Sequence, residues 1–145
     1  MSERASTPRL DMGAWLVVAA GAGLFVASFF PWFRAADPAT PDVIEARNGW
    51  SDPSELFSIA AVLIGVALAV LVVLWTSGTL PAWSGPGGSA GVVLAGALAA
   101  GAALAVKWLR NTEFDAEPGL WAGLALGVVL CAGAVLHLWE TRRRA

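Results

Sequence analysis

One stretch of this sequence restricts the fold more than any other: no charged residue occurs from Leu56 to Val106. That distance is too long for one membrane-crossing helix, which needs about 20 residues, and it suits two crossings joined by a turn. Ser, Gly and Pro residues between Ser77 and Ser89 form a helix-breaking cluster that supplies the turn. We therefore expect a second span at residues 56–76 and a third at residues 90–109.

Two more apolar stretches complete the pattern. Met12 to Phe33 carries no charge and is longer than the apolar part of a signal peptide, so it is predicted to be the first span, residues 12–33. Pro118 and the arginines Arg142–Arg144 enclose a fourth span at residues 119–139. Hydrophobic residues make up 57% of the chain and charged residues 14%, which is too apolar a balance for a soluble domain. The expected fold is one all-α domain, 1–145, a four-transmembrane-helix bundle.

The positions of the tryptophans and arginines indicate where the membrane interfaces lie and how the chain is oriented in the membrane. Seven of the eight Trp residues lie near predicted span ends, where amphipathic rings favour the membrane interface. The arginine cluster at the C-terminus favours both termini on the cytoplasmic side, in the inner (plasma) membrane. Lys107, at the end of the third span, is expected to extend its stem toward the headgroups, and His137 to be a polar tip at the interface.

Small residues four apart predict where the spans pack against each other, because helices associate in lipid through close backbone approach. The fourth span carries Gly119, Gly123 and Gly127 in one line, and the third carries Gly91, Ala95 and Ala99. A tight bundle within one chain is the favoured interpretation, and a dimer face is the alternative.

The loop at residues 34–52 is the longest predicted outer segment. Its end predicts a turn at Asn48 and Gly49, followed by a helix start with Asp52 as N-cap and Glu55 in the first turn. Trp50 is the one Trp away from a span end. It is expected to cap the start of the second span, or else to contact a partner chain.

Chemical motifs are few. The single cysteine, Cys131, excludes an internal disulfide, and Ser28 has no evident buried His or Asp partner that would make it a nucleophile. No catalytic residue, metal site or cofactor is predicted. The net charge of −2 gives no reason to expect nucleic acid as a partner, so the lipid bilayer and other membrane chains are the expected contacts.

Three short motifs suggest a family. Phe29 to Phe33 at the exit of the first span, Asn48 to Trp50 before the second and Pro118 to Gly123 at the start of the fourth resemble small uncharacterised four-span membrane proteins of actinobacteria and related high-GC bacteria. The resemblance implies an inner-membrane bundle and assigns no site residues. We expect a non-enzymatic accessory or structural subunit of a membrane assembly, and the alternative is a small oligomeric transporter or channel.

Overall fold

The computed structural model describes residues 10–36, 44–51 and 55–144. Four helices pack side by side: α1 (Met12–Ala27), α2 (Glu55–Thr76), α3 (Gly88–Arg110) and α4 (Pro118–Arg144). Helix α1 contacts α2 and α4, and α3 contacts the same two helices from the other side. We call these four helices the helical body. Three of them, α2, α3 and α4, are long and apolar enough to cross a membrane, as the sequence predicted.

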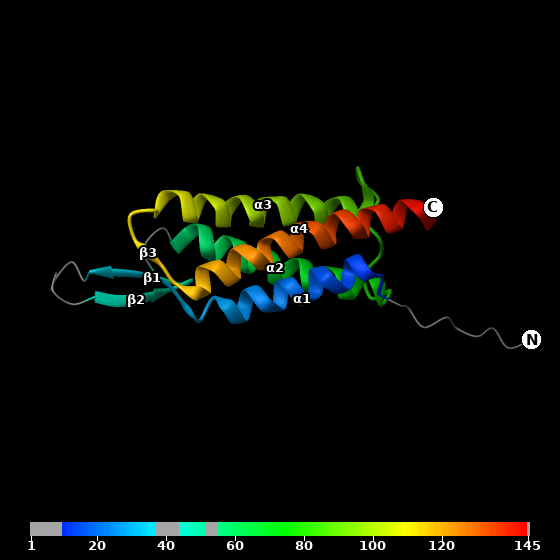
Figure 1. Ribbon diagram of the computed structural model, residues 1–145. Helices are drawn as coiled ribbons and strands as arrows, with labels where there is room; N and C mark the ends of the chain where they lie inside the picture. Colours follow the sequence, from blue (N-terminus) through cyan, green and yellow to red (C-terminus); the bar gives the residue numbers. More distant parts are fainter. Residues whose placement is uncertain (1–9, 37–43, 52–54, 145) are drawn as a thin grey trace, which may run out of the picture.

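A small sheet lies at one end of the helical body (Figure 1). It consists of β1 (Pro31–Ala36), β2 (Ile44–Asn48) and β3 (Asp115–Ala116), in the order β2-β1-β3, with both pairs antiparallel. Helix α1 begins and α4 ends at the opposite end of the helical body. These two ends are called the sheet end and the terminal end.

Helix α1 corrects the predicted first span, because it ends at Ala27 and not at Phe33. Pro31 has no N–H for a helical hydrogen bond and restricts the residue before it to extended backbone. Beyond Pro31 the chain pairs with β2, for example Arg34 with Ala46. The resulting helix of 16 residues is apolar but shorter than the other three. Hydropathy alone misled here, since an apolar strand contributes to the average as strongly as an apolar helix.

The predicted outer loop, residues 34–52, also contains strands, because β1 continues into it and β2 lies within it. The short connection between α3 and α4 holds β3, where Ala116 pairs with Phe33. The pairing of β1 with β2 is irregular between Pro31 and Phe33, which is the position of Trp32. Trp32 is fully buried.

The helical body is apolar on both its inner and its outer surfaces. Its interior is filled by Ala, Val and Leu side chains such as Ala14, Leu24 and Ala97, all with no exposed surface. Large apolar side chains also point outward from every helix: Trp15 is 57% exposed, Leu63 57%, Leu98 56% and Val128 70%. In water such an exterior would be an aggregation hazard, whereas in lipid it is the expected surface.

Candidate functional site

The most polar part of the interior lies at the sheet end and centres on Lys107. Its side chain has no exposed surface, and its Nζ donates a hydrogen bond to Ser58 Oγ on α2 at 2.8 Å. The Nζ also lies 5.5 Å from the Trp32 ring centroid and 5.8 Å from that of Phe33, within the range of cation–π attraction. Lys107 therefore points into the protein, which corrects the expectation that it extends to the headgroups.

Hydrogen bonds connect this lysine to the segment between β2 and α2. Ser58 Oγ donates to the Gly49 carbonyl, and the Gly49 N–H donates to the Ser28 carbonyl at 2.9 Å. A Cβ at position 49 would lie 3.1 Å from that same carbonyl oxygen, so the close approach favours glycine. One continuous chain of bonds thus joins α3, α2, the turn after β2 and the end of α1.

Trp50 contributes a second connection to the end of α1. Its indole N–H donates to Ser28 Oγ at 2.7 Å, and that hydroxyl donates to the Phe25 carbonyl at 2.5 Å. The Trp50 ring lies 6.0 Å from the ring of Phe29. The start of the second predicted span, which Trp50 was expected to cap, is not covered: Leu56 is 72% exposed. Trp50 therefore covers the end of α1.

We call Lys107, Ser58, Ser28, Trp50 and Trp32 the sheet-end cluster. Trp32 joins this cluster to two helices. Its indole N–H donates to the Ala27 carbonyl of α1 at 2.8 Å, and its ring lies against Gly123 of α4. Across the described residues, every buried side-chain nitrogen or oxygen has a hydrogen-bond partner. The hydrogen bonds of the cluster join α1, α2, α3 and the segment after β2, so they hold the sheet on the helices.

The predicted N-cap of α2 lies partly outside the described residues. Asp52 falls outside them, and Glu55 is the exposed first residue of α2. The predicted turn before it is present in detail: the Asn48 side-chain carbonyl accepts from the Trp50 N–H at 3.0 Å, and the Asn48 N–H donates to Ser51 Oγ at 3.1 Å. These bonds set the position of Trp50.

The glycine line of α4 faces other elements of the chain. A Cβ added at Gly123 would lie 3.0 Å from Trp32 Cη2, and one at Gly127 would lie 2.7 Å from Leu104 Cδ1. A Cβ added at Gly119 would overlap the Pro31 carbonyl. The closeness of α4 to β1 and α3 therefore depends on the missing side chains.

The small-residue line of α3 does not lie between the helices. Ala95 and Ala99 are exposed, and Gly91 is near only the turn before its own helix. The expectation that this line packs inside the chain is therefore wrong. The buried residues of α3 follow a different line, which consists of Ala90, Val93, Ala97, Ala100, Leu104 and Lys107.

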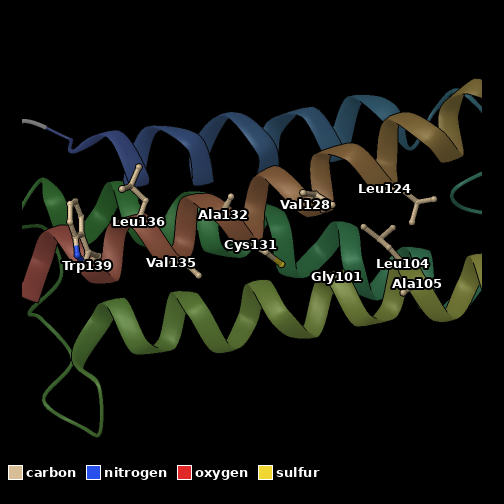
Figure 2. A pocket seen from close by; sticks show the side chains of 11 residues that line it. Gly101, Leu104, Ala105, Leu124, Val128, Cys131, Ala132, Val135, Leu136 and Trp139 are labelled. Carbon is tan, nitrogen blue, oxygen red and sulfur yellow. The ribbon is translucent and has the colours of Figure 1, made fainter.

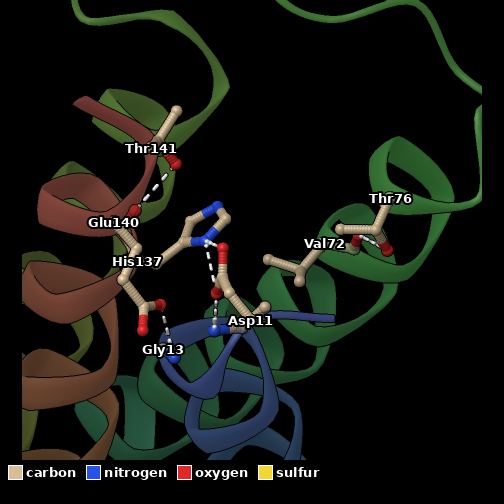
Figure 3. Close-up of polar contacts among 8 residues, drawn as sticks. Asp11, Gly13, Val72, Thr76, His137, Glu140 and Thr141 are labelled. Carbon is tan, nitrogen blue, oxygen red and sulfur yellow. Dashed lines mark hydrogen bonds and ion pairs between the residues drawn. The ribbon is translucent and has the colours of Figure 1, made fainter. Parts of the chain in front are cut away.

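A second polar group lies at the terminal end, where α1 meets α4 (Figure 3). His137 Nδ1 lies 3.0 Å from both carboxylate oxygens of Asp11, and the side chains are 12% and 7% exposed. Asp11 caps α1 by accepting from the Ala14 N–H at 2.7 Å. Glu140 accepts from the Gly13 N–H at 3.2 Å. His137 is therefore a partner of the α1 cap, where the sequence indicated a polar tip at the interface.

Opposing influences act on the Asp11 carboxyl. Burial raises its pKa, but the hydrogen bond from the Ala14 N–H and the contact with His137 favour the charged form, and the net result is a lowered pKa. The positive N-terminal end of α1 also favours the anion. Asp11 is therefore ionised at neutral pH.

An apolar groove of about 860 Å³ runs along the outer side of α4 where it meets α3 (Figure 2). Its lining includes Gly101 and Ala105 of α3 and the residues Val128, Val135 and Trp139 of α4. Cys131 also lines it, with its Sγ 3.3 Å from the Ala97 carbonyl oxygen. The volume falls within the about 300–1,000 Å³ typical of ligand sites.

Sequence reasoning singled out Trp50 but missed its partners. Ser28 was weighed only as a nucleophile, and Lys107 was assigned to the interface. A signal for the burial of Lys107 was present, because it follows Ala97, Ala100 and Leu104 at alternating spacings of three and four, the repeat of one helix face. Within residues 10–36, 44–51 and 55–144, no three His, Cys, Asp or Glu side chains group together as metal ligands. No protein-family model matches the sequence, and no curated protein matches it.

Proposed function

We propose that this chain is a four-span protein of the inner (plasma) membrane, folded as a four-helix bundle with both termini in the cytoplasm. In this proposal it serves as a non-enzymatic accessory or structural subunit of a membrane assembly. The observation that carries the proposal is the apolar exterior on all four helices, combined with an interior whose polar groups form structural hydrogen bonds.

Helix α1 is proposed as the first of the four spans, although it is short. Its 16 residues cover about 24 Å, less than the roughly 30 Å of a hydrocarbon core. Phe29 and Phe30 follow it and are 58% and 56% exposed, so they extend its apolar length. A bilayer also adapts to a short span by local thinning. Because α1 packs between α2 and α4, it would lie at the same depth as these helices.

The orientation rests on the arginines at the terminal end. Arg142, Arg143 and Arg144 end α4 and are exposed. Positive residues next to a span favour the cytoplasmic side. A reporter fused after Ala145 is expected to read as cytoplasmic, and a periplasmic or extracellular reading would contradict this orientation.

The subunit role rests on how the sheet is held. The sheet-end cluster connects the sheet to the helical body by hydrogen bonds, so the sheet presents a preformed surface outside the proposed spans. Strand β2 lies at an edge of the sheet, and its Ile44 is 70% exposed. Exposed edges and apolar residues of this kind are suited to contact with another chain.

Purification of a tagged chain from its own membranes in a mild detergent, followed by native mass spectrometry, tests the role. We expect a second membrane protein to co-purify at a constant ratio. Ile44→Asp should reduce that ratio, while the neighbouring Glu45→Gln should leave it unchanged. Recovery of the chain without a partner would contradict the subunit role.

A transport function receives less support from the structure. A transport path needs polar groups or a water-filled space along the membrane. The interior of the helical body is instead filled by Ala, Val and Leu side chains. A path would have to form between several chains.

A further inference from the structure

We propose that the groove between α3 and α4 binds an anionic phospholipid, with one acyl chain along α4 and the phosphate held by Arg142 and Arg143. This inference rests on the proposed membrane location and adds a ligand to it. It follows from three observations: the apolar lining of the groove, the position of the arginines on the same helix face, and the place of the nearby carboxylates.

The groove is suited to a hydrocarbon chain. Its lining is almost entirely aliphatic, apart from Cys131 and the ring of Trp139. From Leu124 to Trp139 it follows α4 for about 22 Å at 1.5 Å per residue, whereas one leaflet is about 15 Å thick. An acyl chain that enters beside Trp139 would therefore end within the groove.

The helix face that lines the groove continues into two arginines. Val128, Ala132, Val135 and Trp139 follow one another at spacings of four, three and four, and Arg142 and Arg143 follow Trp139 at three and four. Residues at these spacings share one face of a helix. The Arg143 guanidinium lies 3.5 Å from the Trp139 ring centroid, directly at the end of the groove. Both arginines are exposed and can reach a phosphate.

Among the residues that the structure describes, the carboxylates of the terminal end, Asp11 and Glu140, face the other way. Glu140 accepts from the Gly13 N–H, and Asp11 contacts His137 and caps α1, so both point to the side of α4 that packs on α1 (Figure 3). The mouth of the groove thus carries cationic side chains next to an apolar channel. Anionic headgroups are attracted to arginines in this position, and the planar guanidinium matches a phosphate.

The test is competition between two phospholipids with identical acyl chains. The purified chain is incubated in mild detergent with equal amounts of phosphatidylglycerol and phosphatidylcholine, and retained lipid is counted by native mass spectrometry. Each arginine should strengthen binding of the anionic headgroup about fivefold, so two arginines should give a preference for phosphatidylglycerol over phosphatidylcholine of about 25-fold. Equal retention of the two lipids would overturn the proposal.

Two pairs of variants separate the parts of the site. Replacing both Arg142 and Arg143 with Gln should abolish the preference, while replacing Arg47 and Arg110, at the sheet end, should preserve it. Ala132→Phe narrows the groove and should reduce retention of both lipids, whereas Ala122→Phe, at an exposed position of α4 outside the lining, should not. Loss of preference in the Arg47 and Arg110 variant, or equal retention in both Phe variants, would show that no groove site exists.

Thermal unfolding of each variant checks that it folds before lipid is counted. Failure of the chain to remain in membranes after alkaline extraction would overturn the proposed membrane location together with this inference. Stable membrane integration without a preference for phosphatidylglycerol would overturn this inference alone.

Discussion

Lys107 on α3 donates a hydrogen bond to Ser58 on α2 across 2.8 Å, inside the sheet end of the protein. Burial of a polar group is costly unless the group is hydrogen-bonded. Here the same hydroxyl that accepts from the lysine donates onward to the Gly49 carbonyl. The lysine thereby links two helices to the segment that follows β2.

Ser58→Ala should lower the free energy of unfolding by about 1–3 kcal/mol, because it removes a hydrogen-bond partner from the buried Lys107 side chain and from the buried Gly49 carbonyl. The measurement is denaturant-induced unfolding in detergent. Ser77→Ala is the matched control, since that hydroxyl is exposed and should contribute less than about 0.5 kcal/mol. Equal stability of the two variants would mean that the Lys107 bond contributes little.

Gly123→Leu should destabilise the protein by about 1–3 kcal/mol, because the new side chain must displace the Trp32 ring. Val128→Leu enlarges a side chain that is 70% exposed on the same helix, and it should leave stability nearly unchanged. Melting temperatures in detergent compare the two. If both variants melted at the wild-type temperature, the close contact of α4 with Trp32 would not contribute to stability.

Trp50→Ala should lower stability by about 1–3 kcal/mol, less than the roughly 3–5 kcal/mol of a fully buried aromatic residue. It removes both the bond to Ser28 and the ring contact with Phe29. Trp15→Ala, at a site 57% exposed, is the control. Pull-down with the co-purifying partner, measured in parallel, distinguishes the two roles: a lost partner with unchanged stability would identify Trp50 as a partner contact instead of a cap.

The Asp11 carboxylate predicts a loss of stability in acid. Its pKa in the folded protein is lowered below the ordinary value of 3.8, so its contribution is fully present above that pH and disappears as the pH falls through the lowered pKa. Asp11→Asn should remove this part of the pH dependence. Melting temperatures between pH 6 and pH 3 provide the measurement. If the melting temperatures of wild type and Asp11→Asn fell in parallel as the pH is lowered, the prediction would be contradicted.

Local patterns in the sequence were sufficient to predict the helices α2, α3 and α4 and the turn at Asn48. Runs of apolar residues and helix breakers act over a few neighbouring residues, so their effects can be read along the chain. Pro31 is a local signal for the end of α1, but the strand that follows it could not be found this way. It depends on the pairing of β1 with β2 and β3, and such pairings join residues far apart in the sequence.

The choice of the buried helix face shows the same difference between local sequence patterns and contacts far apart in the sequence. Gly91, Ala95 and Ala99 repeat every four residues, as Gly119, Gly123 and Gly127 do, yet only the line of α4 faces other elements of the chain. The buried line of α3 is the one with alternating spacings of three and four, which ends at Lys107. The sequence by itself determined that the helices are apolar and small-residue-rich. Only the tertiary structure decided which face is inside, because neighbouring helices and the Trp32 ring select the side that can approach closely.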